Sequence, residues 1–333
     1  MKHGNISVFV PLNGCPHQCS FCNQKSITGV KYQPMPEDVD EAVNAAFASK
    51  KKYDYEIAFF GGSFTAINRE YMVSLLESAY KYVKNGTVSG IRLSTRPDAV
   101  DREIMEILCR YGVTAVELGA QSMCDDVLQK NMRGHTSQDV RNASRLIKEY
   151  GVSLGLQMMT GLYGSSKEKD IYTANKIISL SPDTVRIYPT VTIKNTVLGD
   201  LFESGEYVPD TLEKSVDLCA FLLTMFMRNN IEVIRLGLHY SEELERDMLS
   251  NNYHPAFKEL CENKLMKDKF LETAHSLGIT GGNVLVFVSP SSVSKFVGQK
   301  RSNLKSLEEL GFNIKTVQDK ALTAYEIKVI QCC

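Results

Sequence analysis

Three cysteines lie within eight residues near the start of the chain. Cys15, Cys19 and Cys22 have the spacing Cys-x3-Cys-x2-Cys, directly after a short apolar run. Thiolates are the ligands of iron–sulfur clusters, and a compact loop can wrap three corners of a cluster. Three protein ligands for a four-iron cluster leave one iron open, as a catalytic metal centre requires. The spacing therefore predicts a catalytic [4Fe–4S] cluster bound by Cys15, Cys19 and Cys22.

Two other uses of these thiols remain open. Zinc could take His17 as a fourth ligand, although a structural zinc loop usually pairs two half-sites and the sequence has no second one. Cys19 and Cys22 could form a redox disulfide. The chain has 9 cysteines, and this odd, clustered set argues against a disulfide framework.

Apolar, β-rich runs alternate with amphipathic helical stretches over the first 236 residues. We expect strands at residues 6–12, 56–60, 90–94, 115–118, 153–158, 185–188 and 232–236. We expect helices at residues 38–50, 69–84, 101–111, 137–150, 166–180 and 210–229. This alternation indicates right-handed βαβ units and a parallel sheet. About six units close only partly, so the predicted fold class is α/β, a partial (β/α)6 TIM-like barrel with its chemistry at the carboxyl ends of the strands.

The alternation stops after about residue 240. Residues 241–279 are mostly helical and charged. The remainder predicts a small α+β arrangement: a strand at 283–288, a helix at 291–297, a tight turn at 298–301, a helix at 302–310, and strands at 313–317 and 326–330. We therefore expect a barrel at residues 1–240, a helical connector at 241–281 and a small α+β domain at 282–333.

The cysteine spacing, with aromatic Phe21 just before the third cysteine, resembles that of the radical S-adenosylmethionine (SAM) superfamily. The resemblance implies two cofactors, a [4Fe–4S] cluster and SAM, whose amine and carboxylate chelate the open iron. It also implies that an electron from the cluster breaks the sulfonium bond. The 5′-deoxyadenosyl radical that results abstracts hydrogen from a substrate, while the protein positions the cofactors and excludes water.

Other segments resemble the SAM-binding elements of that superfamily, each at the end of an expected strand. Gly-Gly-Ser-Phe-Thr begins at Gly61, where glycines expose the backbone to a ligand, although an ordinary βα turn would also use them. Ser94 and Thr95 end the third strand with hydroxyls for the ribose, and Gln157 lies on the fifth, where the family packs the adenine. The resemblance implies SAM contacts at Gly61, Gly62, Ser63, Ser94, Thr95, Gln121, Gln157 and Arg186.

Residues 5–260 are also similar to the radical SAM core of the Elongator catalytic subunit, a family that modifies the wobble uridine of tRNA. The similarity rests on these strings and on Arg133-Gly134-His135-Thr136 and Arg186-Ile187-Tyr188-Pro189-Thr190. Arg133 and Arg186 suit a SAM carboxylate or a phosphate. His135 is either an acid–base group or a hydrogen-bonded structural histidine. That family usually has a longer gap between its first two cluster cysteines, and no acetyltransferase domain is expected here.

The expected C-terminal domain contains a helix, the turn Gly298-Gln299-Lys300-Arg301 and a second helix. This arrangement resembles a KH domain, in which a Gly-x-x-Gly loop clamps a nucleic-acid backbone, with Arg301 in place of the last glycine. The alternative is a plain αβ accessory domain with a solvated basic face. The predicted RNA contacts are Lys295, Lys300, Arg301 and Lys305.

Composition limits the partners. The chain has 43% hydrophobic and 23% charged residues and a net charge of −1, so RNA contact requires a local basic patch. It lacks a signal peptide and an apolar run of about 18 residues, which predicts a cytoplasmic protein without membrane contact. We expect an enzyme that modifies tRNA or another RNA and takes electrons from a donor such as ferredoxin or flavodoxin. The alternatives are a radical SAM enzyme acting on a small molecule, as the oxygen-independent coproporphyrinogen oxidases do, and a non-catalytic iron–sulfur or zinc protein that binds RNA.

Overall fold

The structure, a computed structural model, describes residues 2–11, 19–23, 32–49 and 53–332. The chain forms two compact units. The first consists of residues 1–210 and 226–253, and the second of residues 211–225 and 254–333. Cys15 and His17 lie outside the described residues.

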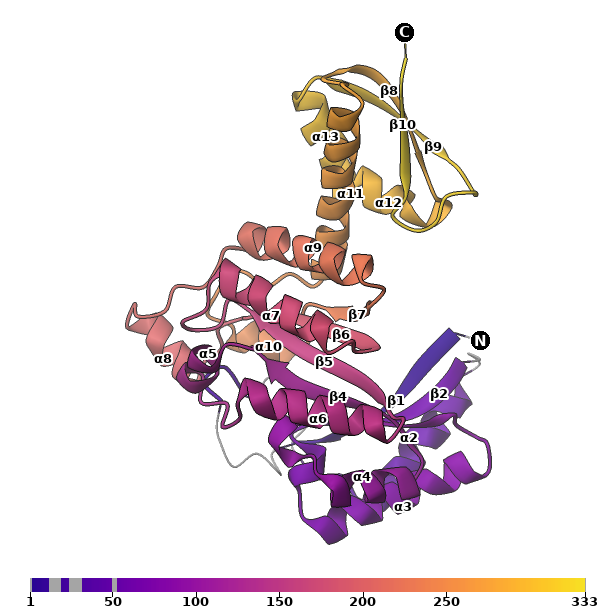
Figure 1. The fold of residues 1–333 in the computed structure, drawn as a ribbon, viewed down its shortest axis with the longest axis vertical. Coiled ribbons are helices and arrows are strands. Elements are labelled where there is room, and N and C mark those ends of the chain that lie inside the picture. Colours follow the sequence, from indigo (N-terminus) through magenta and orange to yellow (C-terminus); the bar gives the residue numbers. More distant parts are fainter. Residues whose placement is uncertain (1, 12–18, 24–31, 50–52, 333) are drawn as a thin grey trace. The chain divides into compact units, whose positions relative to one another are not determined.

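A single parallel sheet forms the centre of the first unit (Figure 1). Its seven strands pair in chain order: β1 (Lys2–Val10), β2 (Tyr53–Gly61), β3 (Gly90–Thr95), β4 (Val113–Gln121), β5 (Ser153–Thr160), β6 (Thr184–Pro189) and β7 (Glu232–Leu236). Every pairing between neighbours is parallel. In the described part of the chain β1 and β7 are the two edges, so the barrel is open. The predicted fold class is confirmed, and each expected strand is present.

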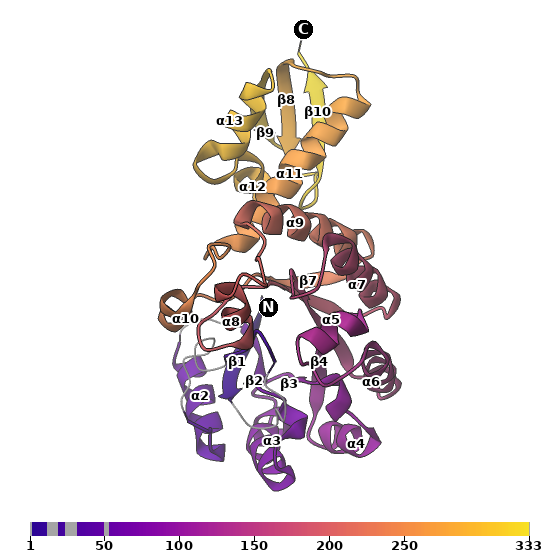
Figure 2. The same cartoon turned by 90° about the vertical axis from the view of Figure 1, so that its left-hand side faces the viewer.

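Helices cover the outer face of this curved sheet (Figure 2). They are α2 (Pro36–Ala48), α3 (Arg69–Lys84), α4 (Arg102–Arg110), α6 (Ser137–Glu149) and α7 (Lys167–Ser179). Polar side chains begin several of them: Asn68 accepts from Tyr71 N, and Thr136 forms a capping box with Asp139. Shorter helices follow the strand ends at α5 (Asp125–Lys130), α8 (Val197–Glu203) and α10 (Glu242–Asp247).

Strand alternation separates an apolar face from a polar one. On β2, Ile57 and Phe59 are completely buried, and Phe59 stacks on Phe64 in the turn that follows. Glu56 directly precedes Ile57 on this strand. Because successive side chains of a strand point to opposite sides, Glu56 lies on the opposite face of the sheet. The apolar face packs under the helices, and the polar face lines the barrel interior.

The second unit is a three-stranded sheet with helices. Its elements are α9 (Leu212–Arg228, of which residues 226–228 are assigned to the first unit), α11 (Phe257–Ser276), β8 (Gly282–Val288), α12 (Val293–Val297), α13 (Ser302–Glu309), β9 (Phe312–Gln318) and β10 (Ile327–Gln331). The strand order is β10-β8-β9, with β8 and β9 parallel and β10 antiparallel to β8. Phe270 joins the layers, since its ring meets those of Phe296 and Phe312.

The expected helical connector at residues 241–281 is divided between the two units. Its first helix, α10, belongs to the first unit, and α11 belongs to the second. Helical periodicity in a sequence shows that a stretch is amphipathic but does not show which core its apolar side joins. Among the described residues no helix is long and apolar enough to cross a membrane.

Candidate functional site

Cys19 and Cys22 lie in a short turn that is held by hydrogen bonds to Asn131, to Leu198 and within the turn itself. Ser20 carries most of the attachment: its hydroxyl donates to Asn131 Oδ1 at 2.7 Å, its amide donates to Asn131 O, and its carbonyl accepts from Leu198 N. The Cys22 amide donates to Cys19 O at 3.1 Å, which closes the turn. Two of the three predicted cluster ligands are therefore held close together after the first strand.

An apolar cluster surrounds this turn. Phe21 is buried with Val127, Leu162, Leu198 and Tyr207, and both cysteines pack against this group. Such surroundings keep water away from two half-buried thiols, as a cluster with a reactive open iron requires. No group of three His, Cys, Asp or Glu side chains able to hold a metal ion occurs among the described residues. The third predicted ligand, Cys15, lies outside them.

Arg133 reaches this turn from the segment after α5. Its Nη1 donates to Cys19 Sγ at 3.1 Å, and its Nη2 donates to Gly119 O at 2.8 Å. The guanidinium carbon lies 5.9 Å from the centre of the Phe21 ring. One side chain therefore connects the cysteine turn to the carboxyl end of β4.

The glycines after β2 serve the strand pairing. Gly61 has φ +121°, and a Cβ there would lie 2.7 Å from the carbonyl oxygen of Val10. The Gly62 amide donates to that same oxygen at 3.0 Å. A side chain at Gly61 would therefore push β1 and β2 apart at the carboxyl end of β1.

The hydroxyls predicted at Ser63 and Thr95 are bonded to each other. Ser63 Oγ and Thr95 Oγ1 lie 2.8 Å apart, and Thr65 Oγ1 lies 2.6 Å from Thr95 Oγ1. Both predicted residues are buried, with 0% and 4% of their surfaces exposed. Their side chains thus join the ends of β2 and β3, a structural role that the sequence strings did not show.

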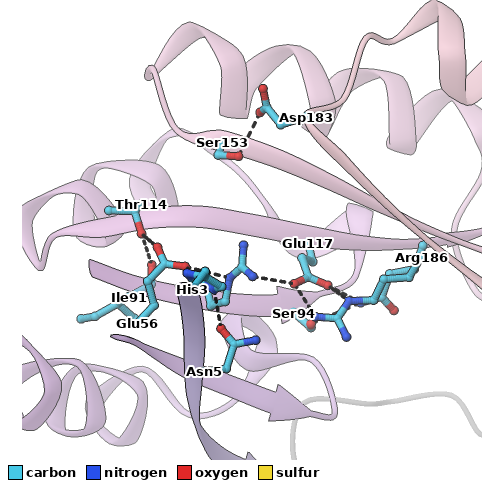
Figure 3. A network of polar contacts seen from close by, with 12 residues as sticks. His3, Asn5, Glu56, Ile91, Ser94, Thr114, Glu117, Ser153, Asp183 and Arg186 are labelled. Atoms are coloured by element: carbon cyan, nitrogen blue, oxygen red, sulfur yellow. Dashed lines mark hydrogen bonds and ion pairs between the residues drawn. The ribbon is translucent and has the colours of Figure 1, made fainter. Parts of the chain in front are cut away.

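Three other predicted residues gather around Glu117 in the barrel interior (Figure 3). Gln157 Nε2 donates to Ser94 Oγ at 3.3 Å and to Glu117 Oε2 at 3.2 Å. Arg186 Nη2 donates to Glu117 Oε1 at 2.7 Å. Burial alone would lower the pKa of Arg186, but the adjacent Glu117 carboxylate outweighs it and raises that pKa. The sequence did not single out Glu117, although it stands at an inward position of β4.

The ion pairs continue from Glu117 toward the amino ends of the strands. Arg92 Nη1 lies 4.0 Å from Glu117 Oε1, and Arg92 Nε lies 3.2 Å from Glu56 Oε2. His3 Nε2 is 3.5 Å from the same oxygen of Glu56. Figure 3 shows His3, Glu56, Glu117 and Arg186 in one row across the strands. We call Glu56, Arg92, Glu117 and Arg186 the interior ion-pair row.

Gln121 ends β4 in an unusual state. Its φ is 62°, which a non-glycine residue seldom adopts, and its Oε1 is buried without a hydrogen-bond partner among the described residues. A buried acceptor without a donor costs free energy, and such a group in a native structure marks a strained or ligand-binding position. The predicted SAM contact at Gln121 fits this observation.

His135 is buried near Arg133. Burial and then the positive charge of Arg133 lower the pKa of His135 to about 4, so its ring is neutral at physiological pH. Nε2 lies 3.2 Å from the carbonyl oxygen of Ala120, which only an N–H on that nitrogen can satisfy. These contacts favour the interpretation of His135 as a structural histidine.

The predicted RNA residues of the second unit fall into two groups. Lys300 and Arg301 are exposed and have φ values of 50° and 64°, and Lys305 is exposed on α13. Lys295, in contrast, lies 3.4 Å from Glu262 Oε1 and 4.2 Å from the centre of the Tyr325 ring. Because its ammonium already has a carboxylate partner, the predicted RNA contact at Lys295 would compete with this ion pair.

The side-chain amide of Asn303 holds the turn between α12 and α13 through hydrogen bonds. Its Nδ2 donates to Asn263 O at 2.8 Å and to Phe296 O at 3.0 Å. Gly298 has φ +78°, and a Cβ there would lie 2.9 Å from the Asn303 amide. Lys300 and Arg301 are therefore presented to solvent by a turn with a defined backbone.

Comparison with sequence models of known protein families identifies the family of this chain. Residues 9–176 match the sequence model of the Radical SAM superfamily, and residues 182–267 match that of the Radical_SAM C-terminal domain. The chain belongs to the radical SAM superfamily. It is an enzyme of the radical SAM type, and the cofactors of that family are a [4Fe–4S] cluster and SAM.

Relatives of this radical SAM chain include tRNA-modifying proteins. A tRNA uridine(34) acetyltransferase of Dehalococcoides mccartyi is 27% identical over 231 residues, which is 59% of this chain and 50% of the relative. Human Elongator complex protein 3 is 28% identical over 252 residues, 67% of this chain and 46% of the relative. The chain thus spans about half the length of these curated relatives.

A solved structure shares the fold. The archaeal Methanocaldococcus infernus Elp3 with an N-terminal deletion superposes with a TM-score of 0.63 at 21% identity, covering 81% of this chain and 63% of that one. The two chains therefore share a fold over most of the length of this one.

The sequence analysis did not predict two charged residues of this radical SAM site. Glu117 and Arg92 occupy inward positions of adjacent strands, and charges in otherwise apolar strands were the available signal. Arg133 was noted for a SAM carboxylate or phosphate but not placed beside a cysteine. Its contact joins residues 114 positions apart, which no local pattern reveals.

Proposed function

We propose that this radical SAM enzyme binds a [4Fe–4S] cluster through Cys15, Cys19 and Cys22, cleaves SAM reductively and modifies a nucleoside of tRNA. The observation that carries the proposal is the cysteine turn itself. It places the Cys19 and Cys22 thiols against an apolar cluster at the carboxyl ends of the strands of a radical SAM barrel.

The described residues fit these cofactors. Cys19 and Cys22 lie against side chains that exclude water, and Arg133 brings a buried positive charge to Cys19. When bound, the reduced cluster supplies the electron that breaks the sulfonium bond of SAM. The task of the chain is to hold the cysteine turn, through Ser20 and Asn131, and to keep solvent out.

SAM would bind next to this turn, at the carboxyl ends of the strands. Gln121 offers a buried acceptor with no donor in the described part of the chain, which suits an amine or hydroxyl of SAM. Ser94 and Gln157 lie on the inner face of β3 and β5, where Gln157 is already oriented by Glu117. Gly61, Gly62, Ser63 and Thr95 would act through the backbone that their pairing holds in place, since both hydroxyls are occupied.

Arg186 would act on SAM indirectly. Its guanidinium is paired with Glu117 and lies 5.1 Å from the centre of the Phe60 ring. We assign it the role of fixing the Glu117 carboxylate and the Phe60 ring.

Two observations support tRNA as the substrate. The curated relatives include several named tRNA uridine(34) acetyltransferases. The second unit presents Lys300, Arg301 and Lys305 on and beside a turn between two helices, as the resemblance to KH domains implies for a phosphate clamp. Lys300 and Arg301 have no carboxylate partner among the described residues, so their charges remain available to phosphate.

The test combines tRNA with the cofactor reaction. Anaerobically reconstituted protein is incubated with SAM and dithionite, and 5′-deoxyadenosine is measured with no addition, with bulk tRNA, with a DNA duplex or with coproporphyrinogen. Of these additions, we expect only tRNA to raise the rate of 5′-deoxyadenosine formation. Stimulation by coproporphyrinogen, with no effect of tRNA, would contradict the tRNA assignment and favour a small-molecule substrate.

A further inference from the structure

Arg133 is a buried cation whose surroundings lack a carboxylate. It is 8% exposed, and it forms no ion pair with any Asp or Glu in the described part of the chain. Its partners are the Cys19 sulfur, the Gly119 carbonyl oxygen and the Phe21 ring, and its Nε is buried without a hydrogen-bond partner there.

The backbone holds this arginine firmly. Its amide donates to Leu128 O at 3.0 Å, closing the end of α5. The residues on either side have positive φ, 52° at Met132 and 70° at Gly134, so the chain bends sharply around it. The side chain points inward from this bend, where both of its terminal nitrogens donate hydrogen bonds.

An uncompensated buried charge is costly, and proteins seldom keep one. Carboxylates are present in the neighbourhood but are engaged elsewhere. Asp98 pairs with Arg96, and Asp139 caps α6 by accepting from Thr136. Arg133 also lowers the pKa of His135, as an unneutralised cation does. An anion bound at Cys19, 3.1 Å from Arg133 Nη1, would compensate this charge.

We propose that Arg133 is the counter-cation of the iron–sulfur cluster, donating a hydrogen bond to the sulfur of Cys19. A cluster with three thiolate ligands is anionic, and reduction makes it more negative. A positive charge and an N–H···S bond therefore stabilise the reduced state and raise the reduction potential. Arg133 is a positioning residue in this account, because it acts through Cys19. The inference rests on the proposed cluster at Cys15, Cys19 and Cys22.

The two donors of Arg133 give the arrangement its geometry. Nη2 is anchored on the Gly119 carbonyl at 2.8 Å, which leaves Nη1 directed at Cys19. Lysine at this position keeps the charge but cannot make two parallel donations from a planar group. Methionine keeps much of the volume and removes both the charge and the donors.

The experiment is a redox titration of reconstituted wild type, Arg133→Lys and Arg133→Met, first without SAM and then with it, in which the electron paramagnetic resonance signal reports the reduced cluster. Arg145→Met is the matched control, because Arg145 is exposed on α6, where it pairs with Glu149. We expect the potential to fall in the order wild type, Lys, Met. At a poise near the wild-type midpoint, the ratio of reduced to oxidised cluster should drop about tenfold in Arg133→Met, a shift of about 59 mV for one electron. The control should match wild type, since water screens its charge.

Iron content separates the two hypotheses. Wild type without iron or a reduced-cluster signal would refute the proposed function rather than the role of Arg133. If wild type and the variants hold equal iron and share one potential, the counter-cation assignment is wrong. A shift that appears only after SAM is added also overturns it and assigns Arg133 to the SAM carboxylate. If Arg133→Met fails to assemble a cluster, the Lys variant decides, and a wild-type potential there would refute the hydrogen bond to Cys19.

Discussion

The barrel contains two kinds of buried arginine. Arg92 and Arg186 belong to the interior ion-pair row, where Glu56 and Glu117 neutralise them. Arg133 lies at the carboxyl ends of the same strands and contacts a thiol, a carbonyl oxygen and an aromatic ring. The row is balanced within the chain, so it is part of the fold. No carboxylate among the described residues balances the charge of Arg133, and in our proposal its anion is the iron–sulfur cluster.

The largest loss of unfolding free energy should follow from removing one carboxylate of the interior ion-pair row. Glu117→Ala leaves both Arg92 and Arg186 without their shared carboxylate in a site where Glu117 is 1% exposed. Breaking a buried pair from one side costs about 3–5 kcal/mol of unfolding free energy. Chemical denaturation of the variant against wild type measures this. A loss below about 1 kcal/mol would mean that the row contributes little to the fold.

The same contrast between paired and unpaired cations exists in the second unit. Lys295 is paired with Glu262, whereas Lys300 and Arg301 have no carboxylate partner among the described residues. We expect the double variant Lys300→Ala/Arg301→Ala to flatten the salt dependence of tRNA binding by roughly 0.7–0.9 log unit per lost contact. Lys295→Ala is the control and should keep the wild-type slope. Filter binding across salt concentrations measures both, and equal slopes for all three proteins would remove this turn from the RNA site.

A smaller effect is expected from His135, whose neutral ring lies near the Arg133 charge. Its pKa is lowered to about 4 in the folded chain, against an ordinary value of 6.5. The stability it contributes is therefore present above the ordinary pKa and is lost as the pH falls toward the folded value. From about pH 7.5 to about pH 5.5, wild type should lose roughly 1 kcal/mol more unfolding free energy than His135→Gln. Identical pH dependence in the two proteins would contradict the lowered pKa.

The smallest change should come from removing Arg133 when no cluster is bound. In iron-free protein no carboxylate among the described residues compensates this cation, so Arg133→Met removes an uncompensated buried charge and should lower the unfolding free energy by less than about 1 kcal/mol, or raise it. Arg186→Met, compared under the same conditions, should cost several times more, because it leaves Glu117 with less of its compensation. Denaturation curves of the two iron-free variants provide the comparison. Equal losses would show that Arg133 is as structural as the arginines of the row.

The sequence predicted the strands and helices better than the side-chain contacts inside the barrel. Each expected strand is present, since β-rich runs bounded by helical periods are a local signal. The row was not predicted, because it depends on which side chains face inward and on the register between strands. The Arg133 contact depends on a bend at residues 132–134 that only the folded chain reveals. The structure assigns α10 and α11 to different units, which helical periodicity in the sequence does not reveal.

The central claim is that the cysteine turn holds a cluster that cleaves SAM. The direct measurement is iron content together with 5′-deoxyadenosine and methionine released under dithionite, for wild type and for Cys15→Ala/Cys19→Ala/Cys22→Ala. We predict about four irons per wild-type chain and release of both products, with neither iron nor products in the triple variant. Iron retained by the triple variant, or zinc with no redox signal in wild type, would contradict the account.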